Sequence, residues 1–375
     1  MNEKDCKAVN CDEAVGLLMT YRCNLDCKYC YIHTKRSKDM TLEKAQLILE
    51  PFLMKAHKLD IIFVGGETLL AIDVIRPLVE WAKSNQWKSD YRFFGSTNGT
   101  LLTPELKDWL TENKQVLTLG LSYDGIPATQ LENRGNDNID VDFFIRTWPH
   151  QPIQMTINSE SVGQMAEGIM YLLDKGAAVH PNVAFEEKEW DEKEIAEYGR
   201  QLNRLIPYYQ THQDAYLISQ FSHNLNEYAN NINQHQEQLE VCGAGHGYQV
   251  FDTDGRSYPC HILSPLVLKG SKLQRIKEGI VSKTKSFADS RCNTCPFTSS
   301  CPTCIACNYL YRGCFQKRDS THCRIMRTEV RACIKKEVMR LKDAKSITPE
   351  DAALIDAIQK LISYEGKGNH FYANV

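Results

Sequence analysis

Three cysteines within eight residues are the side chains of this sequence whose type and spacing point most directly to chemistry: Cys23, Cys27 and Cys30, in the segment CNLDCKYC. Thiolates bind zinc and iron–sulfur clusters. Structural zinc takes four protein ligands, and His33 is the nearby residue that would complete such a set. A four-iron cluster held by three cysteines keeps one iron open to an added ligand. The segment therefore favours an open iron–sulfur cluster, with a zinc knuckle as the alternative.

Cysteine is abundant in the whole chain, with 15 in 375 residues. Five lie in the first 30 residues, and the other ten lie beyond residue 241. A reducing cytoplasm would not keep them as structural disulfides, so metal or redox chemistry is the expected reason for so many thiols. We therefore expect two metal-binding regions on either side of a cysteine-free scaffold.

The bulk composition argues against several other classes of protein. Hydrophobic residues make up 42% and charged residues 24%, and the formal net charge of −3 gives no basis for attraction to nucleic acid or to a membrane. No run of eighteen apolar residues predicts a transmembrane helix. The polar N-terminal segment lacks the apolar core of a signal peptide, so we expect a cytoplasmic protein.

The elements that must position the cysteines alternate between strand and helix. Short apolar runs that end in glycine or polar residues predict strands, and runs with helical spacing follow most of them. This alternation predicts an α/β fold with a parallel sheet, and about 200 residues is short for a full barrel of eight units, so we expect a partial, open barrel. The expected strands are 14–22, 60–70, 91–102, 116–125, 153–159 and 178–186, and the expected helices are 41–58, 71–85, 103–113, 163–176 and 189–210.

From about residue 240 the sequence is rich in cysteine, glycine and proline, and regular periodicity fades until about residue 322. Such a stretch buries little apolar surface, so metal clusters would have to cross-link it. Two more helices are expected, at 324–345 and 348–364. The expected parts are an N-terminal extension (1–13), the barrel (14–225), a cysteine-rich domain (226–335) and a helical tail (336–375).

The first cysteine segment resembles the signature of the radical S-adenosylmethionine (SAM) superfamily, C-x3-C-x2-C with an aromatic residue, here Tyr29, before the last cysteine. It follows the first predicted strand, and the second predicted strand ends in a GGE segment, as in that superfamily. The resemblance implies a partial (β/α)6 TIM-type barrel and a [4Fe–4S] cluster whose open iron chelates the amino and carboxylate groups of SAM. It also implies that Gly65, Gly66 and Glu67 line the SAM amino group, although Thr68 stands where the family has proline.

Two further strand ends resemble the cofactor side of the same superfamily. Ser96 and Asn98, in STNG, resemble residues near the ribose and the methionyl carboxylate of SAM, and a simple turn is the alternative for each. Tyr123 and Asp124, in LSYDG, would face substrate or cofactor, or cap a turn. The resemblance implies one-electron cleavage of SAM to a 5′-deoxyadenosyl radical, which takes a hydrogen atom from the substrate.

The later cysteines resemble the SPASM extension of radical SAM peptide-modifying enzymes, which holds two auxiliary [4Fe–4S] clusters. One interval departs from the family pattern, because two residues rather than three separate Cys301 from Cys304. The residues that carry the resemblance are Cys242, Gly255, Cys260, Cys292, Cys295, Cys301, Cys304, Cys307 and Cys323.

The resemblance divides these cysteines between an inner and an outer auxiliary cluster. The expected inner set is Cys242, Cys260 and Cys304, with Cys307 or Cys314 as a fourth ligand or as the replacement for Cys304. We expect Cys333 to be a buried thiol, because free cysteines are commonly buried, and Cys6 and Cys11 to be incidental. A zinc ribbon built on CNTC and CPTC is the alternative, and it leaves Cys242 and Cys260 unexplained. The expected outer set is Cys292, Cys295, Cys301 and Cys323.

The resemblance also implies a peptide or protein substrate. The segment CPTCIACNY resembles maturases of ribosomally made peptides, which install thioether or carbon–carbon cross-links or invert residues. STNGTLL and SYDG resemble the anaerobic sulfatase-maturating branch, which makes formylglycine. In that branch an aspartate base follows the cysteine of the G-x4-C element, whereas His261 stands here, and a histidine can accept a proton near neutral pH.

The expected partners are a precursor peptide, an electron donor such as flavodoxin or ferredoxin, and a separate peptide-recognition protein. A noncatalytic iron–sulfur electron carrier is the alternative from another class. It predicts no binding of SAM.

Overall fold

The computed structural model describes residues 13–33, 35–55, 57–234, 243–244, 247–284, 287 and 289–366. Two compact units share the chain. The first holds the described residues of 1–123, 134–153 and 243–285, and the second holds those of 124–133, 154–242 and 286–375. Each unit therefore combines segments from both halves of the sequence.

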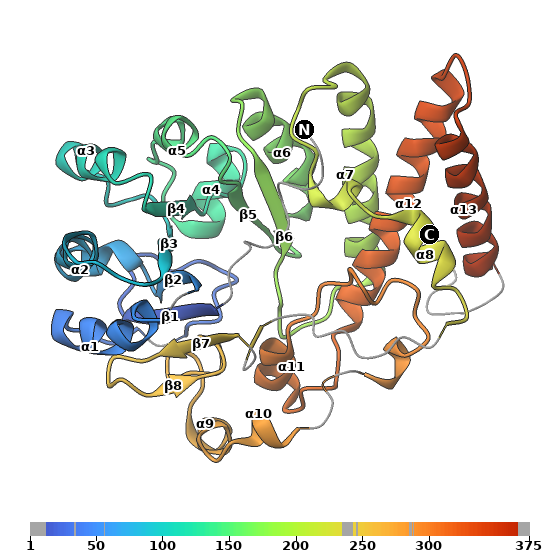
Figure 1. The fold of residues 1–375 in the computed structure, drawn as a ribbon. Helices are drawn as coiled ribbons and strands as arrows, with labels where there is room; N and C mark the ends of the chain where they lie inside the picture. Colours follow the sequence, from blue (N-terminus) through green and yellow to red (C-terminus); the bar gives the residue numbers. More distant parts are fainter. Residues whose placement is uncertain are drawn as a thin grey trace. The chain divides into compact units, whose positions relative to one another are not determined.

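A mostly parallel sheet forms the centre of the first unit (Figure 1). Its strands follow the order β4-β3-β2-β1-β7-β8; β7 and β8 pair antiparallel, and the other neighbours pair in parallel. The prediction of an α/β fold with a parallel sheet is confirmed. The strands are β1 (Glu13–Thr20), β2 (Lys58–Gly65), β3 (Asp90–Thr97), β4 (Leu117–Leu121), β7 (Tyr248–Phe251) and β8 (Ser257–Tyr258).

The apolar sequence of β1 explains its central position. Val15, Leu17 and Leu18 are fully buried, as expected for a strand covered on both faces. On one side β1 pairs with β2, and on the other it pairs with β7, from Ala14↔Tyr248 onward. The pairing with β7 is not evident in the sequence, because β7 has four residues and lies in a stretch without a regular spacing of apolar residues.

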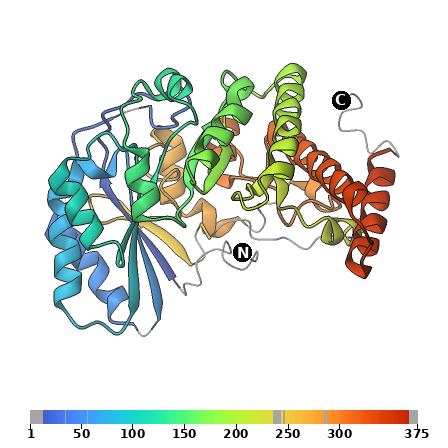
Figure 2. The same cartoon turned by 90° about the horizontal axis from the view of Figure 1, so that it is seen from above.

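Helices α1, α2 and α3 lie along one face of this sheet in both views (Figures 1 and 2). The helix starts have capping residues: Thr41 accepts from the backbone N–H of Lys44, and Pro104 begins α3 after the capping residue Thr103. The helices of this unit are α1 (Leu42–Leu53), α2 (Ile72–Ser84), α3 (Pro104–Glu112), α5 (Val141–Thr147), α9 (Gly270–Lys277) and α10 (Ile280–Lys283).

The second unit consists mainly of helices beside a two-stranded sheet of β5 and β6. The expected series of barrel strands is therefore present, but among the described residues the hydrogen bonding of the sheet does not continue from β4 to β5, where the chain inserts two helices. The elements are β5 (Ile153–Ile157), β6 (Val179–Val183), α4 (Pro127–Arg134), which crosses the boundary of the two units, α6 (Met165–Asp174), α7 (Glu192–Thr211), α8 (Leu225–Asn230), α11 (Ile305–Arg312), α12 (Ser320–Asp343) and α13 (Pro349–Gly366).

Helix α12 begins four residues before its predicted start at residue 324. Asp319 caps it by accepting from the backbone N–H of Thr321, so Cys323 lies in the first turn of the helix and not in the preceding loop. Farther along, Glu329 accepts from the hydroxyl of buried Tyr198 at 2.5 Å, which ties α12 to α7. A helical first turn fixes the backbone of Cys323, which is one of the predicted metal ligands.

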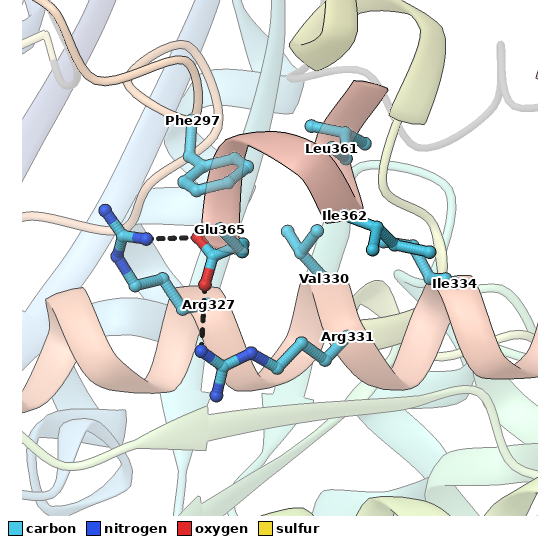
Figure 3. Close-up of a pocket in the computed structure, with 8 residues that line it drawn as sticks. All are labelled: Phe297, Arg327, Val330, Arg331, Ile334, Leu361, Ile362 and Glu365. Atoms are coloured by element: carbon cyan, nitrogen blue, oxygen red, sulfur yellow. Dashed lines mark hydrogen bonds and ion pairs between the residues drawn. The ribbon is translucent and has the colours of Figure 1, made fainter. Parts of the chain in front are cut away.

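Helices α12 and α13 form the walls of a pocket of about 220 Å³ (Figure 3). Glu365 lies between Arg327 and Arg331 and pairs with both, while Val330 and Leu361 contribute apolar walls. Phe297 closes one side and is 2% exposed. Because Phe297 lies between two predicted metal ligands in sequence, the helical pair fixes the loop that carries them.

None of the helices in the described part of the chain is long and apolar enough to cross a membrane.

Candidate functional site

The loop that carries the first three cysteines, residues 21–38 (the cluster loop), is closed at its base. It leaves β1 after Thr20, and the Thr20 hydroxyl contacts the Asp39 carboxylate at 2.5 Å. Asp39 also pairs with Arg22 at 2.7 Å, and the backbone N–H of Tyr21 donates to Lys38. These contacts hold both ends of the loop together at the carboxyl end of a central strand.

Cys23, Cys27 and Cys30 are outside any disulfide and all three are partly buried. A turn brings the backbone N–H of Cys30 to the carbonyl of Cys27 at 3.1 Å, and the backbone N–H of Ile32 donates to Sγ of Cys30 at 3.4 Å. Burial raises the pKa of Cys23, and the charges of Glu67 and Cys30 raise it further. The loop thus gathers thiols and a backbone donor to sulfur, as a cluster site requires.

Zinc fits this loop less well than a cluster does. His33, the residue that would complete a zinc knuckle, is exposed. In the part of the chain that the structure describes, no three histidine, cysteine or carboxylate side chains are arranged to hold a single metal ion. In a four-iron cluster each thiolate binds a different iron, so the thiolates need not converge on one point. The donor set therefore fits an iron–sulfur cluster.

The GGE segment at the end of β2 packs directly against the cluster loop. The backbone N–H of Gly66 donates to Thr20, and that of Glu67 donates to Arg22 at 2.8 Å. A Cβ on Gly66 would come within 2.2 Å of the Arg22 carbonyl oxygen, and one on Gly65 within 2.6 Å of that of Thr20. The glycines are therefore needed for backbone packing under the loop, in addition to the predicted approach of SAM.

Glu67 is 1% exposed and accepts three hydrogen bonds. The donors are the backbone N–H of Leu69 at 3.0 Å, the hydroxyl of Thr97 at 2.7 Å and the backbone N–H of Asn98 at 2.7 Å. Burial raises its pKa, while these hydrogen bonds and the charge of Arg134 lower it. Glu67 thus holds the STNG segment in place, a role that the sequence resemblance did not indicate, and its contact with the SAM amino group stays a prediction.

The STNG segment is also tied to the cluster loop. The side-chain amide of Asn98 donates to Asn24 at 3.0 Å, and that of Asn24 donates to Thr100 at 2.7 Å. The side chain of Ser96 is exposed, while its carbonyl oxygen accepts from the Thr68 hydroxyl at 2.6 Å. Thr68, which replaces the family proline, therefore stabilises the same edge of the sheet with a hydrogen bond.

Arg134 is a further residue of this site that the sequence reasoning missed. Its guanidinium lies 5.4 Å from the centre of the Tyr29 ring, and its charge acts on Glu67. The residue is 7% exposed. A buried guanidinium beside the cluster loop can bind a carboxylate through two parallel hydrogen bonds. No motif marks Arg134, because it stands at the end of a short helix far from the cysteines in sequence.

Tyr123 and Asp124, at the end of β4, are both buried, at 2% and 0% exposure. The carboxylate of Asp124 accepts from the backbone N–H of Thr156 at 3.0 Å and from Asn133 at 3.2 Å, and its backbone N–H donates to Gln130. These contacts tie Asp124 to β5 and α4. A direct role of either residue toward substrate stays a prediction.

His261 is partly buried in the first unit and contacts the cluster loop. Its Nε2 lies 2.9 Å from the hydroxyl of Tyr31, which follows Cys30 in sequence. Burial lowers the pKa of His261 to about 4, so the imidazole is neutral at pH 7 and is a weak base. The pair joins the cluster loop to the segment of Cys260, and a catalytic role of His261 stays a prediction.

The four cysteines of the predicted outer set lie together in the second unit. Burial raises the pKa of Cys301 to about 12; Arg318 lowers it, and the charges of Cys323, Cys295 and Cys292 raise it. Turn hydrogen bonds fix the loop. The backbone N–H of Cys295 donates to the Cys292 carbonyl, and the Thr298 hydroxyl contacts the carbonyls of Cys292 and Cys295. The structure therefore gathers four thiols from two sequence segments, which is the ligand number of a closed [4Fe–4S] cluster.

The predicted inner set includes Cys242, which lies outside the described residues, as do Cys6 and Cys11. Cys260 is buried in the first unit. In the second unit Cys304 caps α11, and a hydrogen bond from Cys307 lowers the pKa of Cys304 to about 7. The choice among the possible inner ligands therefore stays a prediction.

Cys314 and Cys333 each make a hydrogen bond through the thiol. Cys314 is exposed, and its thiol donates to Gln316 at 3.1 Å. Cys333 is 2% exposed in α12 and its thiol donates to the carbonyl of Phe221. The prediction that Cys333 is a buried thiol is confirmed.

Residues 17–147 match the family model described as the Radical SAM superfamily. The match covers β1 to β4, the cluster loop and the GGE and STNG segments. The chain therefore carries a radical SAM domain, which implies a [4Fe–4S] cluster and SAM. Members of this superfamily are enzymes that catalyse radical chemistry.

Two curated relatives are similar to parts of the chain. An uncharacterized protein of Methanocaldococcus jannaschii, MJ0907, is 26% identical over 207 residues, which is 51% of this chain and 71% of that protein. The radical SAM cyclopropyl synthase TigE of Paramaledivibacter caminithermalis is 31% identical over 147 residues, or 34% of this chain and 30% of that protein. The similarity to TigE thus covers a minor part of either chain.

Solved structures with the same fold cover most of the chain. The protein anSMEcpe, solved with bound AdoMet, has a TM-score of 0.62 at 15% identity and matches 93% of this chain and 99% of its own. SuiB of Streptococcus suis, solved with its precursor peptide SuiA, has a TM-score of 0.57 at 16% identity over 83% of this chain and 75% of its own. At such identities the likeness establishes a shared fold.

Proposed function

We propose that this chain is a radical SAM/SPASM peptide maturase. It would cleave SAM reductively and abstract hydrogen from a ribosomally made peptide, and so install a thioether or carbon–carbon cross-link or another modification. The observation that carries the proposal is the joining of the cluster loop to the GGE and STNG segments by hydrogen bonds. Those contacts support a SAM site built from the three thiols and the candidate SAM residues at one edge of the sheet.

The second cysteine region supports the SPASM part of the proposal. Four thiols of the outer set lie close enough to act on one another's pKa. Two auxiliary [4Fe–4S] clusters are proposed, the outer one on these four cysteines and the inner one on Cys242, Cys260 and Cys304, with Cys307 or Cys314. The structures of SuiB with a precursor peptide and of anSMEcpe with a peptide are the reason to propose a peptide substrate.

When bound, the cluster and SAM supply a 5′-deoxyadenosyl radical, and the protein's own residues bind and orient the reactants. Cys23, Cys27 and Cys30 would hold the cluster, with one iron left for SAM. Arg134 would bind the SAM carboxylate, and Glu67 the amino group. Exclusion of water from this edge in the complex would keep a reactive radical close to the intended C–H bond.

Formylglycine formation is the second candidate, because the fold is shared with anSMEcpe along nearly the whole of that chain. The residue after Cys260 is the neutral, partly buried His261, with a pKa of about 4, and not a carboxylate. Formylglycine chemistry needs a base to accept a proton, and the weak base at this position is the observation that counts against it. Incubation with the Cp18Cys peptide, which was solved with anSMEcpe, separates the two, since an aldehyde product detected by mass spectrometry would support the second candidate.

Anaerobic incubation with SAM and dithionite tests the radical activity. We expect chromatography to show 5′-deoxyadenosine and methionine from the reconstituted protein. Cys27→Ala is the control, and it should lose about four irons per chain and form no 5′-deoxyadenosine. A wild-type protein that carries iron but never cleaves or binds SAM would instead be the noncatalytic electron carrier.

Replacing Arg134 by glutamine is expected to weaken SAM binding by about ten- to a hundredfold. A hydrogen-bonded ion pair in a buried site contributes about 1.5–3 kcal/mol, and tenfold corresponds to about 1.4 kcal/mol. The dissociation constant can be read from the change that SAM causes in the electron paramagnetic resonance (EPR) spectrum of the reduced cluster. Arg134→Lys should recover part of the affinity, and Arg146→Gln, at an exposed arginine, is the matched control. Unchanged affinity in Arg134→Gln would exclude this role.

A further inference from the structure

A half-buried arginine lies beside the outer cysteine set in the second unit. Nη1 of Arg318 donates a hydrogen bond to Sγ of Cys292 at 2.9 Å. The same guanidinium is close enough to Cys301 and Cys323 for its charge to act on both thiols. Three of the four sulfurs of the set therefore share one cation.

The surroundings of Arg318 fix it in this position. Its backbone N–H contacts the carboxylate of Asp289 at 3.4 Å, and that carboxylate pairs with Arg291 at 2.6 Å. Among the described residues no carboxylate forms an ion pair with the guanidinium of Arg318 itself. Its side chain thus has thiol sulfur as its hydrogen-bond acceptor, which is unusual for an arginine.

The fold of this region does not depend on the guanidinium of Arg318. The loop of Cys292 already has its own turn hydrogen bonds, and α12 already has a capping residue in Asp319. Phe297 anchors the same loop by packing on Tyr228, with ring centres 5.4 Å apart. The structural needs of this region are therefore satisfied without the guanidinium.

We propose that Arg318 raises the reduction potential of the outer auxiliary cluster by donating a charge-assisted hydrogen bond to a ligand sulfur. Reduction by one electron makes the cluster and its thiolates more negative, so a fixed positive donor stabilises the reduced state more than the oxidised one. Hydrogen bonds to sulfur and local charge are known determinants of cluster potential. The inference rests on the proposed function, which supplies the cluster.

Arg318→Gln tests the proposal, because glutamine keeps a donor but removes the charge. We expect the equilibrium between oxidised and reduced outer cluster to shift about tenfold toward the oxidised state, which for one electron is about 59 mV. The measurement is an EPR-monitored redox titration of the reconstituted full chain, in a background where Cys23, Cys27 and Cys30 are alanine. The potential of the inner cluster should be the same with Arg318 and with Arg318→Gln, and it serves as the internal reference of the titration.

Two further variants make the result specific. Lys317→Gln removes the same charge at an exposed neighbouring position, and it should leave both potentials unchanged. Arg318→Lys keeps the charge, and it should recover part of the shift. A potential in Arg318→Gln equal to that of Lys317→Gln, at full iron content, would overturn the proposal. Loss of the outer cluster's iron from both Arg318 variants would also overturn it, because the residue would then be needed for assembly.

Failure of the underlying function gives a different result. A double variant, Cys292→Ala with Cys295→Ala, should lose about four irons and one EPR signal if the outer cluster exists. If that variant keeps all of its iron and both signals, the proposed cluster is wrong, whatever the potentials of the Arg318 variants are.

Discussion

Gly66→Ala is expected to lose the iron of the cluster loop and all formation of 5′-deoxyadenosine, while the auxiliary clusters remain. The new Cβ would lie 2.2 Å from the carbonyl oxygen and 2.7 Å from the carbonyl carbon of Arg22, and 2.9 Å from Cβ of Cys23. These are mostly backbone atoms, which a change of side-chain rotamer cannot relieve. The GGE backbone or the cluster loop must therefore move.

The cost follows from the contacts that join the two segments. Overpacking typically costs about 1–3 kcal/mol, and here it also breaks the hydrogen bond from the backbone N–H of Glu67 to Arg22. Movement of this pair displaces Cys23, the first thiol of the loop. A ligand displaced by about an ångström is enough to disturb a metal site.

Iron analysis and EPR spectroscopy of the reconstituted protein measure the effect. Gly163→Ala is the matched control, because a Cβ at Gly163 has no atom within 4 Å. The control should keep full iron and full activity. A Gly66→Ala protein with normal iron content and normal SAM cleavage would show that the cluster loop does not depend on this close packing.

Glu67→Ala is expected to lower the unfolding temperature of the first unit and to abolish SAM binding. Removal of the carboxylate leaves three donors, on Leu69, Thr97 and Asn98, without their acceptor in a buried place. An unpaired buried donor costs about 1–3 kcal/mol, and the favourable interaction of the Glu67 carboxylate with the charge of Arg134 is lost. Differential scanning calorimetry under anaerobic conditions measures the first effect.

Glu67→Gln separates support of the fold from contact with SAM. Glutamine keeps the shape and one acceptor oxygen, so we expect a smaller loss of stability and retained iron. The ammonium of SAM would lose its carboxylate partner, and the dissociation constant of SAM should rise at least about tenfold. Glu112→Gln, at an exposed position in the same unit, is the control. Unchanged SAM affinity in a stable Glu67→Gln protein would restrict Glu67 to holding the STNG segment.

Much of the fold and part of the site were predictable because their signals are local. Apolar runs set the strands of the parallel sheet, and Thr41 and Thr348 mark helix starts by capping donors three residues away. The spacing of Cys23, Cys27 and Cys30 is also a local signal. These predictions needed no knowledge of contacts between distant segments.

Other features were not predictable, since each depends on residues far apart in the chain. The pairing of β1 with β7 joins residues more than 200 positions apart, and the four residues of β7 show no period of their own. The closeness of Arg134 to Tyr29 and of Arg318 to Cys292 likewise has no motif. A single arginine in a polar segment looks like any solvated charge until the fold buries it.

The sequence by itself indicated metal-cluster chemistry at the cysteines. The spacing of cysteines along a short loop limits how far apart their thiols can lie, whatever the rest of the fold is. The tertiary structure alone decided which charged side chains surround the thiols and what the GGE glycines pack against. Burial, charge and hydrogen bonding depend on long-range packing, and they are the quantities that tune a cluster and orient its ligand.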